Sequence, residues 1–124
     1  MSILIVEDDE KHMILVRDVL QFKGYQTLEA ATATEGLRLA REARPDLVLM
    51  DIQLPDFDGI TALALLRADP QTQNIPVVAV SASVMPDDQQ RVAVSGFEAF
   101  ITKPINMKHF IETVERFIGK PKGK

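Results

Sequence analysis

Four short, mostly apolar runs in this chain each end, without a gap, at a charged or hydroxyl-bearing residue. The runs are 3–6, 47–50, 77–80 and 99–102, and the residues that follow them are Glu7 and Asp8, Asp51, Ser81 and Lys103. Continuous apolar runs of this length are typical of parallel strands that helices cover on both faces. Because parallel strands end at one edge of a sheet and ligands bind beyond that edge, we expect these polar groups to converge on one small site.

The segments between these runs carry helical patterns, which predicts an α/β fold. Apolar residues recur at helical spacing after the first run, Thr32 to Glu35 fits a capping box, and a final helix is expected to open at Asn106. That last helix is expected to bury Phe110, Ile111, Val114, Phe117 and Ile118. Adding an alternating strand over 25–29 gives a doubly wound, five-stranded parallel sheet, for which 2-1-3-4-5 is the commonest order. Five helices are expected, and the helix over 86–95 is the least apolar.

Composition limits what the chain can do. With 124 residues we expect one domain over 1–118 and a basic, disordered tail over 119–124. A formal charge of −4 without a Lys/Arg block argues against nucleic-acid binding, and no apolar run is long enough for a membrane span. The start lacks a signal-peptide pattern, so we expect a cytoplasmic protein. Because there is no cysteine, any metal must be held by oxygen or histidine.

The predicted cluster of carboxylates indicates metal and phosphoryl chemistry. Two carboxylates at about 4 Å repel by roughly 4 kcal/mol at an effective dielectric near 20, so the cluster requires a compensating cation. Oxygen ligands favour Mg²⁺, with Mn²⁺ as a possible substitute. An aspartate can also be the nucleophile that forms an acyl phosphate. In that chemistry Lys103 would neutralise phosphoryl charge, and the Ser81 hydroxyl would donate a hydrogen bond to a phosphoryl oxygen.

Four motifs in this order resemble the receiver domain of two-component response regulators over the whole chain. The motifs are Leu4-Ile5-Val6-Glu7-Asp8-Asp9, Leu49-Met50-Asp51-Ile52-Gln53-Leu54-Pro55 with Asp58-Gly59, Val78-Ala79-Val80-Ser81-Ala82, and Thr102-Lys103-Pro104. The resemblance implies the flavodoxin-like receiver fold. The stretches 50–55 and 76–80 are most similar to those of single-domain regulators of bacterial cell-cycle and polarity kinases.

The resemblance also implies a role for each acidic residue. Asp51 would accept the phosphoryl group from a phosphohistidine of a sensor kinase or a histidine phosphotransfer protein. Asp8 and Asp51 would bind Mg²⁺, the Gln53 backbone carbonyl would complete the protein ligands, and Glu7 would act through water. Asp9 is expected to cap a helix or to lie outside the direct ligands of the ion.

Further implied roles concern switching. Lys103 would pair with the phosphate and precede a cis bond to Pro104. Ser81 would move toward the phosphate, and Phe100, which stands where many chemotaxis-type receivers have Tyr, would turn inward to follow it. Gln53 and Ser83 stand where the family tunes hydrolysis of the acyl phosphate. His12 and His109 are expected to face solvent.

The output is expected to be a protein contact, because no effector domain or long linker follows residue 118. The surface predicted to respond is the fourth helix, strand five and the final helix, in a protein that is a monomer or weak dimer. Two alternatives stand beside this switch. One is an Asp-nucleophile phosphatase, which short loops and Gln53 in place of a second acid argue against; without such turnover the chain is not expected to be an enzyme. The other is a phosphorylation-independent adaptor with the same fold.

Overall fold

The computed structural model describes residues 1–56, 58–81 and 96–119 and places a parallel sheet between two layers of helices. In chain order the elements are β1 (Ser2–Val6), α1 (Glu10–Phe22), β2 (Gln26–Ala30), α2 (Ala33–Ala43), β3 (Leu47–Asp51), α3 (Gly59–Ala68), β4 (Val77–Ser81), β5 (Ala99–Thr102) and α5 (Met107–Ile118). The strand order is β2-β1-β3-β4-β5, and all four pairings are parallel. The predicted fold class and strand order are therefore confirmed. The helix predicted over 86–95, Ser83 and residues 120–124 lie outside the described residues.

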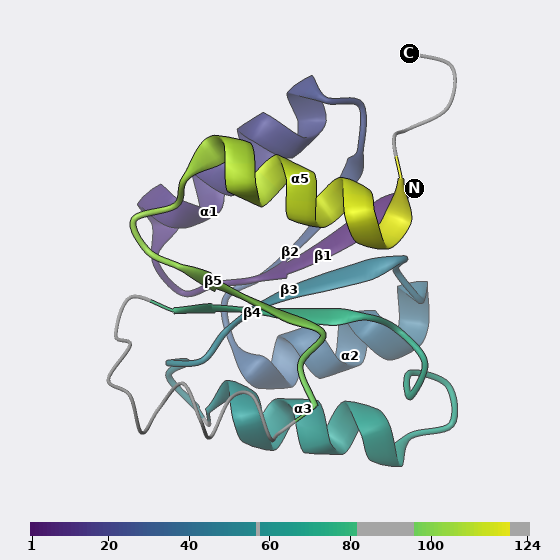
Figure 1. Ribbon diagram of the computed structural model, residues 1–124. Helices are drawn as coiled ribbons and strands as arrows, with labels where there is room; N and C mark the ends of the chain where they lie inside the picture. Colours follow the sequence, from purple (N-terminus) through teal and green to yellow (C-terminus); the bar gives the residue numbers. More distant parts are fainter. Residues whose placement is uncertain (57, 82–95, 120–124) are drawn as a thin grey trace.

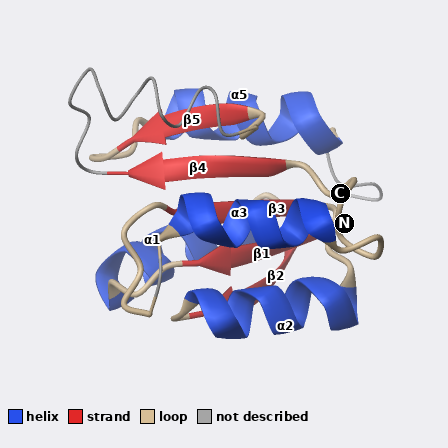
Figure 2. Ribbon diagram, turned by 90° about the horizontal axis from the view of Figure 1, so that it is seen from below, coloured by secondary structure: helices blue, strands red, loops and turns tan. Residues whose placement is uncertain are grey.

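The two faces of the sheet are covered by different helices. In Figure 1, α1 and α5 lie on one side of the strands and α2 and α3 on the other, and Figure 2 shows α2 and α3 side by side. On β1 and β3, odd-numbered residues such as Ile3 pack in the core under α1 and α5, whereas even-numbered ones such as Leu4 pack in the core over α2 and α3. On β4 the parity is reversed, because Val78 packs under α1 and α5 and Val77 packs over α2 and α3. Alternation along each strand thus assigns every residue to one face.

Local signals in the sequence set the helix ends. Asp9, Thr32, Asp58 and Asn106 are the N-caps of α1, α2, α3 and α5, and each side chain accepts from a backbone N–H of the first turn. At the end of α1, Gly24 has a positive φ of 100°, and hydrogen bonds from Gly24 N to Gln21 O and from Tyr25 N to Leu20 O form a Schellman motif. The predicted helix starts at Thr32 and Asn106 are confirmed.

The buried face of α5 differs in part from the prediction. Phe110 and Val114 are buried as expected, but Ile111, Phe117 and Ile118 are only partly buried. Thr113 is buried instead, because its hydroxyl donates to His109 O at 2.8 Å and so meets the core without an unpaired polar group.

No helix within the three described ranges combines the length and the hydropathy that a bilayer crossing requires.

Candidate functional site

Strand alternation brings Glu7, Asp51 and Lys103 to one face at the carboxyl edge of the sheet. Each has the parity of the odd-numbered core residues of its strand, as Ile5, Leu49 and Ile101 do on β1, β3 and β5. Glu7 directly follows β1, Asp51 is the last residue of β3, and Lys103 directly follows β5. The three side chains are therefore directed toward the side of the sheet that α1 and α5 cover.

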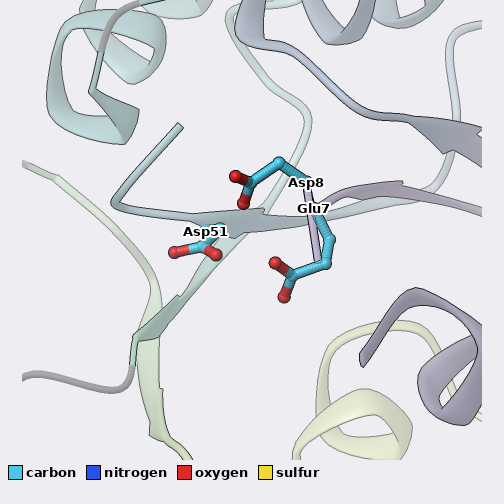
Figure 3. A group of neighbouring side chains, drawn as sticks. All are labelled: Glu7, Asp8 and Asp51. Atoms are coloured by element: carbon cyan, nitrogen blue, oxygen red, sulfur yellow. The ribbon is translucent and has the colours of Figure 1, made fainter. Parts of the chain in front are cut away.

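The carboxylates of Glu7, Asp8 and Asp51 face a common space (Figure 3). One oxygen from each lies within 4.8 Å of the others. Glu7 and Asp51 are buried, whereas Asp8 is exposed. This is a donor set of hard oxygens, open to solvent on the side of Asp8, which fits a divalent cation that keeps part of its water shell.

Lys103 bridges the two buried carboxylates. Its Nζ lies 2.6 Å from Glu7 Oε1 and 3.1 Å from Asp51 Oδ2, and all three side chains are at most 9% exposed. Burial alone would lower the pKa of Lys103, but its hydrogen bonds to Glu7 and Asp51 outweigh burial, and the pKa lies above its ordinary value. Lys103 is therefore a fixed ammonium beside Asp51.

Glu7 is the carboxyl group that the site perturbs most. Desolvation, followed by the hydrogen bond and the charge of Asp51, raises its pKa to about 7, although Lys103 acts in the opposite direction. The second oxygen, Oε2, accepts from Asp9 N at 3.2 Å. Without a bound cation, the site therefore favours the protonated form of Glu7 to a higher pH than water does.

Asp51 is held from two sides. Its Oδ2 accepts from Lys103, and its Oδ1 accepts from Gln53 N at 3.0 Å. Gly59 is required behind it, because a Cβ there would lie 2.6 Å from Asp51 O. The Asp51 carboxylate is thus oriented both by Lys103 and by the backbone of the loop that follows β3.

An open cleft of about 580 Å³ lies over this cluster. Its lining residues are Glu7, Asp8, Asp9, His12, Asp51, Gln53, Lys103 and Pro104. The peptide bond from Lys103 to Pro104 is cis. The cleft gives a small anionic group access to Asp51.

His12 also lines this cleft, which the sequence analysis did not predict. The expectation that it faces solvent is wrong: the residue is half-buried, and its Nδ1 is buried without a hydrogen-bond partner among the residues described. The available signal was its place in the sequence, because His12 lies in the first turn of the helix that directly follows the acidic residues after β1. His109 is exposed, as expected.

Three further predicted site residues, Ser81, Phe100 and Gln53, lie on β4, on β5 and in the loop after β3. Ser81 ends β4 opposite Thr102 of β5, at the same edge of the sheet, and its side chain lies outside the described part of the chain. Phe100 lies in β5 opposite Ala79 and is half-buried. Gln53 is exposed in the loop after β3. The structure therefore brings together Glu7, Asp8, Asp51 and Lys103, with Gln53 and the backbone of Ser81 nearby.

The sequence matches one family model over most of its length. Residues 3–115 match the response regulator receiver domain. The chain belongs to this family, whose members take phosphoryl groups from kinases and act on downstream partners. The similarity over nearly the whole chain agrees with the signalling function expected from the motifs.

Two curated response regulators are similar to this chain over nearly its whole length. The chain is 46% identical to the polar-differentiation response regulator DivK of Brucella anthropi over 118 residues, which cover 95% of this chain and 96% of that protein. It is 45% identical to the DivK of Brucella melitensis, with the same coverage.

Solved structures agree on the fold. The receiver domain of a sensor histidine kinase from Pseudomonas aeruginosa, with a magnesium ion coordinated in its active-site cleft, is 28% identical and has a TM-score of 0.88, covering 96% of this chain and 98% of that one. The signal receiver domain of a histidine kinase from Syntrophus aciditrophicus is 31% identical, also with a TM-score of 0.88, covering 99% and 93%. Both support a receiver fold.

Proposed function

We propose that Asp51 accepts a phosphoryl group from the phosphohistidine of a sensor kinase or phosphotransfer protein in a Mg²⁺-dependent reaction. The observation that carries this proposal is the cluster itself, in which three carboxylate oxygens lie within 4.8 Å and the Lys103 ammonium contacts the buried pair. Asp8, Asp51 and the Gln53 carbonyl would hold the ion, and Glu7 would act through water; Mn²⁺ is a plausible substitute on ligand chemistry. When bound, the ion neutralises charge on the carboxylates and on the transferring group.

The chain's own residues perform the remaining steps. An oxygen of Asp51 attacks phosphorus, the bond from phosphorus to the donor imidazole nitrogen breaks, and the imidazole leaves with the electron pair of that bond. Lys103 Nζ, already 3.1 Å from Asp51 Oδ2, stabilises the added negative charge. Gln53 N, which donates to Oδ1, keeps the carboxylate oriented. Water later cleaves the acyl phosphate, and Gln53 and Ser83 tune that rate.

Phosphorylation is proposed to signal through a protein contact. It would add negative charge at Asp51, draw the Ser81 hydroxyl toward the phosphoryl group and turn Phe100 inward. The responding surface would comprise the fourth helix, β5 and α5. The domain would span 1–118, with the basic residues 119–124 outside it, in a cytoplasmic monomer or weak dimer that turns over no external substrate.

The proposal is tested by intact-protein mass after incubation with acetyl phosphate or phosphoramidate. Wild type should gain a single phosphoryl adduct with Mg²⁺ and none with chelator, and Asp51→Asn should gain none. Asp18→Asn is the matched control. Asp18 is an exposed aspartate on α1, so its substitution should leave adduct formation unchanged. The absence of an adduct on folded wild type with Mg²⁺ would overturn the proposal and favour the adaptor alternative, which the family match does not favour.

A further inference from the structure

One side chain in the loop between β3 and α3, that of Asp56, is hydrogen-bonded to the start of α2. Asp56 Oδ1 accepts from Ala33 N at 2.9 Å, and Oδ2 accepts from Thr34 N at 2.8 Å and from Thr34 Oγ1 at 2.6 Å. The hydrogen bonds from Thr34 and Ala33 hold the pKa of Asp56 well below its usual range. The carboxylate is thus an ionised cross-link between this loop and the start of α2.

Asp56 completes the cap of α2. The N-cap Thr32 serves only Glu35 N, at 3.1 Å, so Ala33 N and Thr34 N receive their acceptors from Asp56. A carboxylate is favoured there, because the first turn of a helix presents unpaired N–H groups and the positive end of the helix dipole. The start of α2 is therefore a specific anchor for the loop.

The anchor itself is fixed against the strand that carries Glu7 and Asp8. A Cβ at Gly36 would lie 2.8 Å from Val6 Cγ2, so α2 packs closely on the end of β1. Glu7 N also donates to Ala30 O at 2.9 Å, which ties Glu7 to the segment that leads into α2. The start of α2 thus has a defined position relative to the acidic residues after β1.

The loop is also held where it begins and ends. Gln53 N donates to Asp51 Oδ1, Gly59 N donates to Ile52 O at 2.8 Å, and Asp58 caps α3 by accepting from Thr61 N at 2.7 Å. These bonds join the loop to itself and to its own helix. Among the bonds described here, those of Asp56 join it to the β1 side of the site.

We propose that Asp56 is a positioning residue for the metal site: by fastening the β3–α3 loop to α2, it sets the position of the Gln53 carbonyl relative to Asp8 and Asp51. This inference rests on the proposed function, in which that carbonyl binds Mg²⁺. Groups that orient metal ligands typically change metal affinity by about tenfold or more when removed, although they never contact the ion. Asp56→Ala should therefore weaken Mg²⁺ binding while leaving every ligand in the chain.

The matched control is Thr32→Ala. It removes a hydrogen bond from the same helix terminus but leaves the cross-link to the loop intact. Isothermal titration calorimetry of Mg²⁺ into the phosphate-free proteins should give a Kd about tenfold higher for Asp56→Ala and within about twofold of wild type for Thr32→Ala. Adduct formation by Asp56→Ala should be reduced at low Mg²⁺ and recover at saturating Mg²⁺.

Asp56→Asn supplies a graded test and a fallback if the alanine variant does not fold. It keeps one acceptor oxygen, so its Kd should lie between those of wild type and Asp56→Ala. Equal Kd values for Asp56→Ala and Thr32→Ala, or an Asp56→Asn value equal to wild type when the alanine variant is unfolded, would overturn the positioning role and leave Asp56 a helix cap. Failure of the proposed function is distinct, because then wild type itself would form no Mg²⁺-dependent adduct.

Discussion

Both edges of the sheet carry ion pairs, but the pair at the amino edge is partly exposed, whereas the charges at the carboxyl edge are largely buried and are balanced differently. At the amino edge, Arg67 of α3 donates to Gln73 O at 3.0 Å, to Ile75 O at 2.8 Å and to Glu98 at 2.7 Å. Glu98 in turn accepts from Val77 N at 2.7 Å. In this pair one cation thus meets one anion, and the remaining partners are backbone groups in the link from α3 to β4 and at the start of β4.

The carboxyl edge has an excess of negative charge. Among the described residues, Glu7 and Asp51 share the ammonium of Lys103, Asp8 adds a third carboxylate beside them, and the pKa of Glu7 is raised to about 7. An arrangement selected only for stability would resemble the amino edge, because uncompensated buried charge is unfavourable. The difference indicates that the carboxyl edge is arranged for an added cation and that the amino edge is a structural support.

Among the variants that test this comparison, Lys103→Met is expected to have the largest effect on the free energy of unfolding. Removing the ammonium leaves two buried carboxylates without their cation, and the free energy of unfolding above pH 7 should fall by about 2–4 kcal/mol in metal-free buffer. Mg²⁺ should restore part of this loss, because it supplies positive charge to the same oxygens. Urea unfolding with Mg²⁺ and with chelator measures both quantities.

Arg67→Met is the matched control at the other edge. It leaves two carbonyls and Glu98 with fewer partners, so the free energy of unfolding should fall by about 1–3 kcal/mol. The difference in free energy of unfolding between wild type and Arg67→Met should be the same with and without Mg²⁺. If Mg²⁺ rescued both variants equally, the contrast between the two edges would be wrong.

A second test uses the pKa of Glu7. A carboxyl group whose pKa is raised from 4.5 to about 7 on folding binds its proton more tightly in the folded state. Its contribution to stability is therefore complete below pH 4.5 and is lost as the pH rises through about 7. Metal-free wild type should lose about 1–3 kcal/mol relative to Glu7→Gln across that window.

The control for this titration is the same pair of proteins with saturating Mg²⁺. A bound cation favours the ionised form of Glu7, so the difference between wild type and Glu7→Gln should then vary much less with pH. A pH dependence that is the same with and without Mg²⁺ would show that Glu7 does not sense the cation.

The sequence was sufficient to predict the centre of this site. Glu7, Asp51 and Lys103 follow buried parallel strands without a gap, and strand order and alternation then determine which edge and face they share. These are rules of regular structure, which depend on a few residues in each element. For the same reason the strand order and the caps Thr32 and Asn106 could be predicted.

The parts that could not be predicted depend on the paths of loops. The bond from Asp56 to Ala33 and the ion pair of Arg67 with Glu98 join residues 23 and 31 positions apart, and nothing in the local pattern specifies either partner. His12 was misjudged because its helix was assigned by its apolar face, whereas its burial depends on how the first turn of α1 meets the cleft. Such contacts follow from tertiary packing.

The smallest effect on metal-free stability is expected from Asp8→Asn, and it tests the cluster most directly. Asp8 is exposed, so relieving its repulsion with Asp51 and Glu7 should raise the free energy of unfolding by no more than about 0.5 kcal/mol. The stabilisation that Mg²⁺ gives wild type should nevertheless be largely lost, because a carboxylate ligand has become a neutral amide.

Asp9→Asn is the matched control, since it removes the same charge from the neighbouring exposed residue while an amide oxygen can still cap α1. Thermal melts with and without Mg²⁺ should therefore separate two variants that differ by one position: Asp9→Asn should keep the Mg²⁺-induced rise in Tm and Asp8→Asn should not. An equal rise in both would mean that the acidic edge attracts Mg²⁺ only through its overall charge, and the contrast with the balanced amino edge would then concern charge alone.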